Sequence, residues 1–273
     1  MQKLSLNDTR SIPQMGFGVW QIPEETTENA VATAIGLGYR LIDGARIYGN
    51  EAGMGRGVRN SGVAREDLFV TSKVWNSDQG RDAARAAIRG SLERTGLDYL
   101  DLMLIHWPCP EKDLYVETWQ ALIEARDTGL VRSIGVSNFT ATHLDRIIAK
   151  TGVAPALNQI ELHPRMQQSD MRAANAERGV ITQSWSPLGR ANAFSDPTLV
   201  EIARRLDRSV PQVILRWHIQ LGLSVIPRSS NPDHMASNFA AQSFELSDAD
   251  MAAIEGMETG ARIGPDPDAA EFD

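Results

Sequence analysis

The sequence contains four polar residues whose groups complement one another chemically: the carboxyl of Asp43, the phenol of Tyr48, the ammonium of Lys73 and the imidazole of His106. A phenol has a reference pKa of about 10 and is a poor acid at neutral pH unless an adjacent cation stabilises its phenolate. Lys73 is able to supply that cation, and Asp43 would pair with Lys73 and orient it. His106 can donate a hydrogen bond to a carbonyl oxygen. The set therefore fits polarisation of a carbonyl followed by its protonation.

These groups must be positioned by strands, because they lie at or just after the ends of short apolar runs. Taken singly, Asp43, Lys73 and His106 are also ordinary strand-end or interior residues, but their joint order with Tyr48 favours the catalytic interpretation. Apolar runs alternate with longer amphipathic stretches from about residue 15 to about residue 240, which is typical of parallel strands joined by helices. We expect eight strands, at Gly16–Val19, Arg40–Asp43, Leu68–Val74, Tyr99–His106, Ser133–Ser137, Ala156–Gln159, Ile181–Trp185 and Ser224–Ile226.

The stretches between the strands carry apolar residues at three- and four-residue spacing, which predicts amphipathic helices. Most of these patterns end near a glycine, a residue able to close a helix in the left-handed conformation. Helical patterns of this kind occupy Thr27–Leu37, Ala83–Thr95, Val116–Thr128 and Pro211–Leu221.

Eight such units predict an α/β fold of the (β/α)8 TIM-barrel type, and the whole chain, residues 1–273, is expected to form a single barrel domain. No G-x-G-x-x-G motif follows the first strand, which argues against a Rossmann fold. Leu4–Leu6 and Ser11–Pro13 predict an N-terminal β-hairpin that plugs one end of the barrel. Two extra helices are expected near Pro197–Asp207 and Ser247–Glu258, and the tail from Arg262 should be irregular.

Composition narrows the class of partner. The formal charge of −8 and the pI of about 5.2 disfavour nucleic acid and anionic membranes, both of which call for a basic surface. The first residues lack the apolar core of a secretory signal and no run is long enough for a membrane span, so we expect a soluble, cytoplasmic protein that binds a small molecule. The single cysteine, Cys109, excludes an internal disulfide.

Ordered motifs along nearly the whole chain resemble those of the aldo-keto reductase superfamily, and especially of the bacterial 2,5-diketo-D-gluconate reductases. The motifs are Met15-Gly16-Phe17-Gly18-Val19-Trp20, Leu41-Ile42-Asp43 through Tyr48-Gly49-Asn50-Glu51, Leu104-Ile105-His106-Trp107-Pro108, Ile134-Gly135-Val136-Ser137-Asn138-Phe139, and Asn158-Gln159-Ile160-Glu161-Leu162-His163-Pro164.

The resemblance implies reduction of a carbonyl by hydride from a reduced nicotinamide, with Tyr48 as general acid. It makes Asp43, Tyr48, Lys73 and His106 the catalytic tetrad. It also implies that Ser137, Asn138 and Gln159 bind the nicotinamide carboxamide, that Trp185 stacks on the ring where relatives often have tyrosine, and that Ser186, Leu188 and Gly189 contact the pyrophosphate.

The adenosine end of the cofactor site departs from the family pattern. Related enzymes commonly have lysine where this chain has Arg228, and arginine where it has His234, while Asn238 matches. Arg228 can bind a 2′-phosphate bidentately, with Ser229 and Ser230 as hydroxyl donors, so NADPH is the expected cofactor. A neutral imidazole at His234 lacks a permanent charge and leaves NADH possible.

Three tryptophans, Trp20, Trp75 and Trp107, fall at predicted carboxyl strand ends, so we interpret them as walls of the substrate pocket rather than as core aromatics. No histidine spacing predicts a metal site. Two other functions stay open: a non-catalytic nicotinamide-binding subunit that senses redox state, and a barrel hydrolase or isomerase. The substrate is also open among 2,5-diketo-D-gluconate, related keto sugars, α-diketones, α-keto esters and aldehydes. A monomer is expected.

Overall fold

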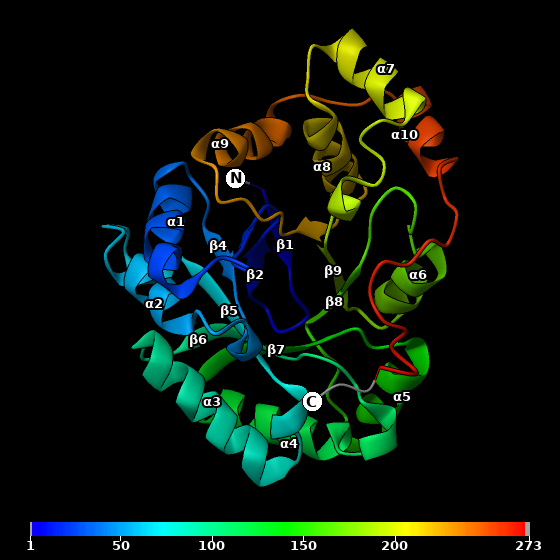
Figure 1. The fold of residues 1–273 in the computed structure, drawn as a ribbon. Coiled ribbons are helices and arrows are strands. Elements are labelled where there is room, and N and C mark those ends of the chain that lie inside the picture. Colours follow the sequence, from blue (N-terminus) through cyan, green and yellow to red (C-terminus); the bar gives the residue numbers. More distant parts are fainter. Residues whose placement is uncertain (1, 271–273) are drawn as a thin grey trace.

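The computed structural model describes residues 2–270 and contains a sheet of eight parallel strands, in the spatial order β3 to β10 that follows the chain. Helices surround this sheet (Figure 1). The strands are β3 (Phe17–Gly18), β4 (Leu41–Asp43), β5 (Phe69–Val74), β6 (Leu100–Ile105), β7 (Val131–Ser137), β8 (Leu157–Glu161), β9 (Ile181–Trp185) and β10 (Ser224–Val225).

Backbone contacts beside β3 close the sheet into a barrel. Met15 forms a parallel bridge with Val225, and the Gly16 N–H donates to the Val225 carbonyl at 2.8 Å. The Val225 N–H in turn donates to the carbonyl of Gln14 at 2.8 Å. The predicted (β/α)8 barrel is therefore confirmed, although β3 and β10 are shorter than the sequence suggested. Gly16, Val19 and Ile226 keep backbone hydrogen bonds to neighbouring chain segments but lie outside the regular ladder.

The helices fill the connections between strands, as the alternating pattern predicted. α7 and α10 are the two extra helices expected, and they pack against each other at one side of the barrel (Figure 1). The helices are α1 (Glu24–Gly36), α2 (Glu51–Arg59), α3 (Arg81–Thr95), α4 (Tyr115–Asp127), α5 (Ala141–Thr151), α6 (Ser169–Glu177), α7 (Pro197–Leu206), α8 (Val210–Gln220), α9 (Pro232–Phe239) and α10 (Asp248–Glu255). Within the described residues no helix combines the length and the apolar character needed to cross a membrane.

The predicted hairpin is present as β1 (Lys3–Ser5) and β2 (Ser11–Pro13), paired antiparallel. Leu6 and Ile12 belong to one buried cluster with Leu41 and Leu102, which lie toward the amino ends of their strands. The hairpin therefore plugs the amino end of the barrel and leaves the carboxyl ends free for a site. The tail after α10 has no helix or strand up to residue 270, as expected, and its last three residues lie outside the described part.

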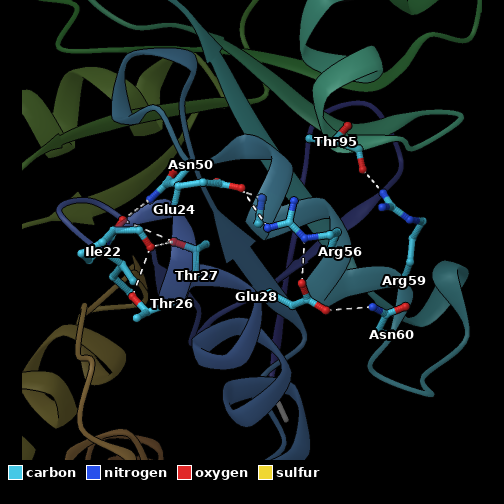
Figure 2. A network of polar contacts seen from close by, with 12 residues as sticks. Ile22, Glu24, Thr26, Thr27, Glu28, Asn50, Arg56, Arg59, Asn60 and Thr95 are labelled. Carbon is cyan, nitrogen blue, oxygen red and sulfur yellow. Dashed lines mark hydrogen bonds and ion pairs between the residues drawn. The ribbon is translucent and has the colours of Figure 1, made fainter.

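Helices α1 and α2 pack closely and are joined by ion pairs at their edge. Arg56 pairs with Glu24 at 2.9 Å and with Glu28 at 2.7 Å (Figure 2). Two glycines of α2 allow the close approach to α1, because a side chain at Gly53 or Gly57 would overlap atoms of α1, and Gly55 makes the same kind of close contact with Thr95 at the end of α3. Such partly exposed ion pairs each stabilise a fold only modestly. The close packing of the two helices therefore contributes more to their contact than the ion pairs do.

Gly55→Ala tests the packing of α2 against the end of α3. A Cβ at Gly55 would overlap the backbone carbonyl of Thr95, which cannot move independently of α3. Overpacking of this kind destabilises by about 1–3 kcal/mol, so we expect the melting temperature to fall by roughly 5 °C in differential scanning calorimetry. Gly90→Ala is the matched control, because its Cβ would meet only the flexible end of Arg94. Equal melting temperatures for the two variants would contradict the packing described.

Candidate active site

A cavity of about 930 Å³ lies at the carboxyl ends of the barrel strands. Its lining comes from the ends of the strands and from the loops that follow them, together with part of the C-terminal tail. Thirteen of the residues predicted for the site line it: Trp20, Asp43, Tyr48, Trp75, His106, Trp107, Ser137, Asn138, Gln159, Trp185, Ser186, Leu188 and Arg228.

The predicted ion pair of Asp43 and Lys73 lies at the base of this cavity, where Asp43 lines the wall and Lys73 does not. The Lys73 ammonium donates to Asp43 Oδ1 at 2.6 Å and to the Gly44 carbonyl at 2.8 Å, and its side chain is fully buried. Burial lowers the pKa of Lys73, but the nearby Asp43 and Tyr48 outweigh that effect and hold the pKa above its ordinary value. Lys73 is therefore a permanent cation that lies behind the cavity wall rather than in it.

Tyr48 ends a short 3₁₀ turn, Arg46–Tyr48, whose following residue Gly49 has the left-handed φ of 70° that reverses the chain into α2. Its ring lies 5.2 Å from the Lys73 ammonium. Burial raises the pKa of the phenol, and Lys73 opposes that rise. The phenol is therefore protonated at neutral pH and lies next to the charge of Lys73, which would stabilise the phenolate after proton loss.

Asn50, two residues after Tyr48, ties this turn to the loop that carries Trp20. Its side-chain amide donates to the carbonyls of Val19 and Ile22, both at 2.8 Å (Figure 2). The bonds connect the loop after β3 with the loop after β4, so one residue aligns two walls of the cavity.

His106 follows β6 and faces Tyr48, with ring centroids 5.8 Å apart. Burial, together with the charge of Lys73, lowers the pKa of the imidazole well below its usual range. The ring is therefore neutral at neutral pH and carries one N–H donor. Its Nδ1 has no hydrogen-bond partner among the described residues, and the ring packs against Trp75 at 5.0 Å.

The residues predicted to hold a carboxamide form a connected amide network. Gln159 Nε2 donates to Asp43 Oδ2 at 2.8 Å and to Gln183 at 2.7 Å, which uses both of its protons and leaves Oε1 as an acceptor. Asn138 Nδ2 donates to the His106 carbonyl and to Ser137 Oγ, both at 3.0 Å. Asn138 Oδ1 accepts from the indole of Trp185 at 2.8 Å, which fixes that ring beside the amides.

The loop after β9 forms the next section of the cavity. Ser186 and Leu188 line it, whereas Gly189 lies behind them and does not. Arg190 adopts a left-handed φ of 49°, and its guanidinium lies 5.4 Å from the ring of Trp20 on the opposite wall. The loop after β9 therefore contacts the loop after β3 at the cavity.

The far end of the cavity is formed by the segment between β10 and α9. Arg228 lines it and donates to Gln21 at 3.1 Å. Ser229 Oγ instead bonds the backbone of Asn231, so this hydroxyl is engaged in a turn. Ser230, His234 and Asn238 do not line the cavity; His234 is exposed on the first turn of α9 and Asn238 is buried on its inner face.

The three predicted pocket tryptophans line the cavity but differ in exposure. Trp75 and Trp107 are buried in one cluster with Cys109 and Ala270, and Trp185 packs against this cluster. Trp20 is 37% exposed at the cavity mouth. Sequence reasoning missed further lining residues, among them Ile47, Arg190, Phe194, Gly264 and Pro265. Ile47, which adjoins Tyr48, carried a local signal, and the resemblance to aldo-keto reductases implied that a C-terminal loop, to which Gly264 and Pro265 belong, borders the pocket.

Among the described residues no group of three or more His, Cys, Asp or Glu side chains is arranged to hold a metal ion. An acid–base set buried at the carboxyl ends of a (β/α)8 barrel, with an elongated cavity above it, defines an enzyme-type site for a small molecule.

Comparison with known proteins agrees with this class. The sequence model described as "Aldo/keto reductase family" matches residues 14–259, and the chain belongs to this family. An aldo-keto reductase of Mycolicibacterium smegmatis is 52% identical over 99% of this chain and 98% of its own length. A crystal structure of an aldo/keto reductase from Brucella melitensis is 48% identical, with a TM-score of 0.91, over 94% of this chain and 99% of that one. The structure of Gox0644, an aspartate-to-alanine variant in complex with NADPH, is 44% identical, with a TM-score of 0.96, over 99% of each chain.

Proposed function

We propose that this protein reduces the carbonyl of a small molecule to an alcohol, with NADPH as hydride donor and Tyr48 as general acid. The observation that carries the proposal is the buried Asp43–Lys73 pair beneath the Tyr48 ring, with neutral His106 on the other side. No other described group combines a protonated phenol with a permanent adjacent cation at the floor of the cavity.

In this mechanism the chain's own residues hold the substrate and move the proton. When bound, the reduced nicotinamide supplies the hydride for the carbonyl carbon. The N–H of neutral His106 donates to the carbonyl oxygen and polarises it. The Tyr48 phenol then gives its proton to that oxygen, while Lys73 stabilises the resulting phenolate and Asp43 keeps Lys73 oriented.

The donor set of the cavity fits a nicotinamide dinucleotide. Gln159 Oε1 remains as an acceptor for a carboxamide N–H, and the Trp185 ring, fixed through Asn138, offers a face for stacking. Ser186, Leu188 and Gly189 would hold the pyrophosphate. Arg228, Ser230 and His234 lie just before α9 or on its first turn, where the helix N-terminus favours an anion such as a 2′-phosphate, and Asn238, on the last turn of α9, would contact the adenosine end of the cofactor. Ser229 would join them only by giving up its bond to Asn231. The complex of the relative Gox0644 with NADPH supports the same cofactor.

His234→Arg tests the adenosine end. Arginine would add a permanent charge beside Arg228, so we expect the Kd of NADPH to fall about three- to tenfold and that of NADH to change less than about twofold. Quenching of tryptophan fluorescence during titration with each cofactor measures both constants. His234→Gln is the neutral control and should leave both unchanged. Equal decreases in the Kd of NADPH and the Kd of NADH would mean that the 2′-phosphate binds elsewhere.

The primary test of function is the decay of absorbance at 340 nm with 2,3-butanedione or 2,5-diketo-D-gluconate, run in parallel with NADPH and NADH. Decay supports the reductase and ranks the cofactors. Cofactor binding without decay across a panel of keto sugars, α-keto esters and aldehydes would instead favour a non-catalytic redox-sensing subunit. Absence of any cofactor binding would favour a hydrolase or isomerase.

The tryptophan walls at Trp20, Trp75 and Trp107 favour broad activity toward small α-dicarbonyls, including 2,5-diketo-D-gluconate. Turnover of a single sugar acid among the panel would contradict this breadth. We further propose that the enzyme acts as a monomer in the cytoplasm, which size-exclusion chromatography with light scattering and cell fractionation would examine.

A further inference from the structure

The fully buried carboxylate of Glu161 binds the backbone of the C-terminal tail. Glu161, the last residue of β8, accepts the Ile263 N–H at 2.6 Å on Oε1 and the Gly264 N–H at 2.8 Å on Oε2. Its Oε1 also lies 3.1 Å from His163 Nε2, and neither side chain is exposed to solvent. Burial raises the pKa of Glu161, but the bonds from His163 and the two tail amides outweigh it, so the pKa is lowered and the carboxylate is charged.

The tail residues that Glu161 holds form part of the cavity wall. Gly264 and Pro265 line the cavity, and from there the chain runs along α6 toward α5, as the red segment of Figure 1 shows. Farther along, Asp268 lies 3.5 Å from His143 Nε2, and Ala270 is buried against the tryptophans of the pocket. The two bonds to Glu161 attach this segment directly to the end of strand β8.

Gly264 also packs directly against the indole of Trp185. A Cβ on Gly264 would lie 2.5 Å from Trp185 Cη2 and 2.8 Å from Glu161 Oε2, so the glycine fits in a gap between the two side chains. Trp185 is in turn bonded to Asn138 at 2.8 Å. A shift of the tail at Gly264 would therefore remove a packing contact from one side of the Trp185 ring.

We propose that Glu161 is a positioning residue that holds residues 263–265 as a wall shared by the carbonyl substrate and the face of Trp185. It would then set the KM for the carbonyl and the rate of cofactor release, and leave proton transfer by Tyr48 unaltered. The inference rests on the proposed reductase function, because it assigns Trp185 to the nicotinamide ring.

Glu161→Gln tests the inference with little change in volume. The amide presents an N–H to a backbone N–H of the tail, so one of the two tail bonds is lost. Hydrogen bonds to a charged group are strong enough that we expect KM for 2,3-butanedione to rise about tenfold or more, with kcat reduced less than about threefold. Stopped-flow fluorescence should record NADPH dissociation at least about fivefold faster.

A second variant approaches the same contact from the tail. Gly264→Ala crowds both Glu161 and Trp185, so it should raise KM as Glu161→Gln does. Because both changes act on one contact, the double variant should be little worse than the more severe single one. Additive effects would overturn the coupling.

Asp101→Asn is the matched control for loss of a buried carboxylate. Asp101 also accepts a backbone N–H, from Val70 at 2.9 Å, but it lies near the amino end of β6, away from the cavity. It should lower thermal stability and leave KM unchanged. A KM change equal to that of Glu161→Gln, or equal losses of kcat and kcat/KM in Glu161→Gln, would refute the positioning role.

Hydrogen exchange provides a readout that does not depend on turnover. The amides of Ile263 and Gly264 should be protected in the wild-type enzyme and exchange faster in Glu161→Gln, with no change at the amides of β6. Wild-type turnover of NADPH tests the proposed function by itself, and exchange at these two amides tests the attachment even if no substrate is reduced. Unchanged protection in Glu161→Gln would overturn the inference alone.

Discussion

Replacement of Tyr48 by phenylalanine should reduce kcat for carbonyl reduction by about 10²–10⁴-fold, the usual contribution of a positioned general acid. The substitution removes one oxygen from a half-buried side chain next to Lys73 and leaves the ring in place. The Kd of NADPH should therefore change less than about twofold. Steady-state rates at 340 nm and fluorescence titration of the cofactor measure the two effects separately.

The pH profile gives an independent check on the same residue. Burial raises the pKa of the Tyr48 phenol, so the wild-type rate should hold through neutral pH and fall only when the pH rises through that alkaline pKa. The residual rate of Tyr48→Phe should lack this fall.

Tyr115→Phe is the matched control for Tyr48→Phe, because Tyr115 is buried in α4 with its hydroxyl 3.3 Å from Arg146 and does not line the cavity. It should keep the wild-type kcat. A Tyr48→Phe enzyme with wild-type kcat would exclude the phenol as the acid.

The regular alternation of apolar runs and amphipathic stretches was sufficient to predict the barrel and the end of it at which the candidate active site lies. Parallel strands all point the same way, so residues at their carboxyl ends converge even when they are far apart in sequence. This is why Asp43, Tyr48 and His106 were expected together and lie together around one cavity. The hairpin and the extra helices α7 and α10 were predictable because their signals are local: turn residues, caps and apolar spacing.

The remaining features depend on contacts that no local pattern encodes. The bond from the Ile263 N–H to Glu161 joins residues 102 positions apart, and nothing in the tail composition predicts it. The contact of Arg190 with Trp20 depends on a left-handed backbone in the loop after β9. Ser229 looked like a phosphate ligand by residue type, yet its hydroxyl bonds a turn in the described structure. Pocket walls of this kind arise from loop packing, which periodicity does not describe.

The second large effect is expected at Lys73, where stability and activity should both fall. Lys73→Met leaves the buried Asp43 with Gln159 as a side-chain donor but without its cation. Breaking a buried pair by removing one partner destabilises by about 3–5 kcal/mol, which corresponds to a drop in melting temperature of roughly 6–20 °C. kcat should fall about 10²-fold or more, because no charge then stabilises the Tyr48 phenolate.

The pH dependence of this stability has a definite sign. The folded-state pKa of Lys73 is raised, so the contribution of the pair is complete at neutral pH and is lost only as the pH rises through that raised value. Thermal melts of the wild type should therefore show no loss from this pair on going from pH 6 to about pH 8, and the difference between wild type and Lys73→Met should narrow in strong alkali.

A double variant separates the two roles of the lysine. In Asp43→Asn/Lys73→Met no uncompensated charge is buried, so much of the lost stability should return, as it does when both members of a buried pair are replaced. Activity should stay as low as in Lys73→Met, because the cation beside Tyr48 is still missing. Recovery of kcat together with stability would mean that Lys73 supports the fold alone, and the phenol would then need another source of stabilisation for its negative charge. Retention of low kcat in a well-folded double variant would assign the cation to the chemical step, since the ring of Tyr48 and the imidazole of His106 are unchanged in it.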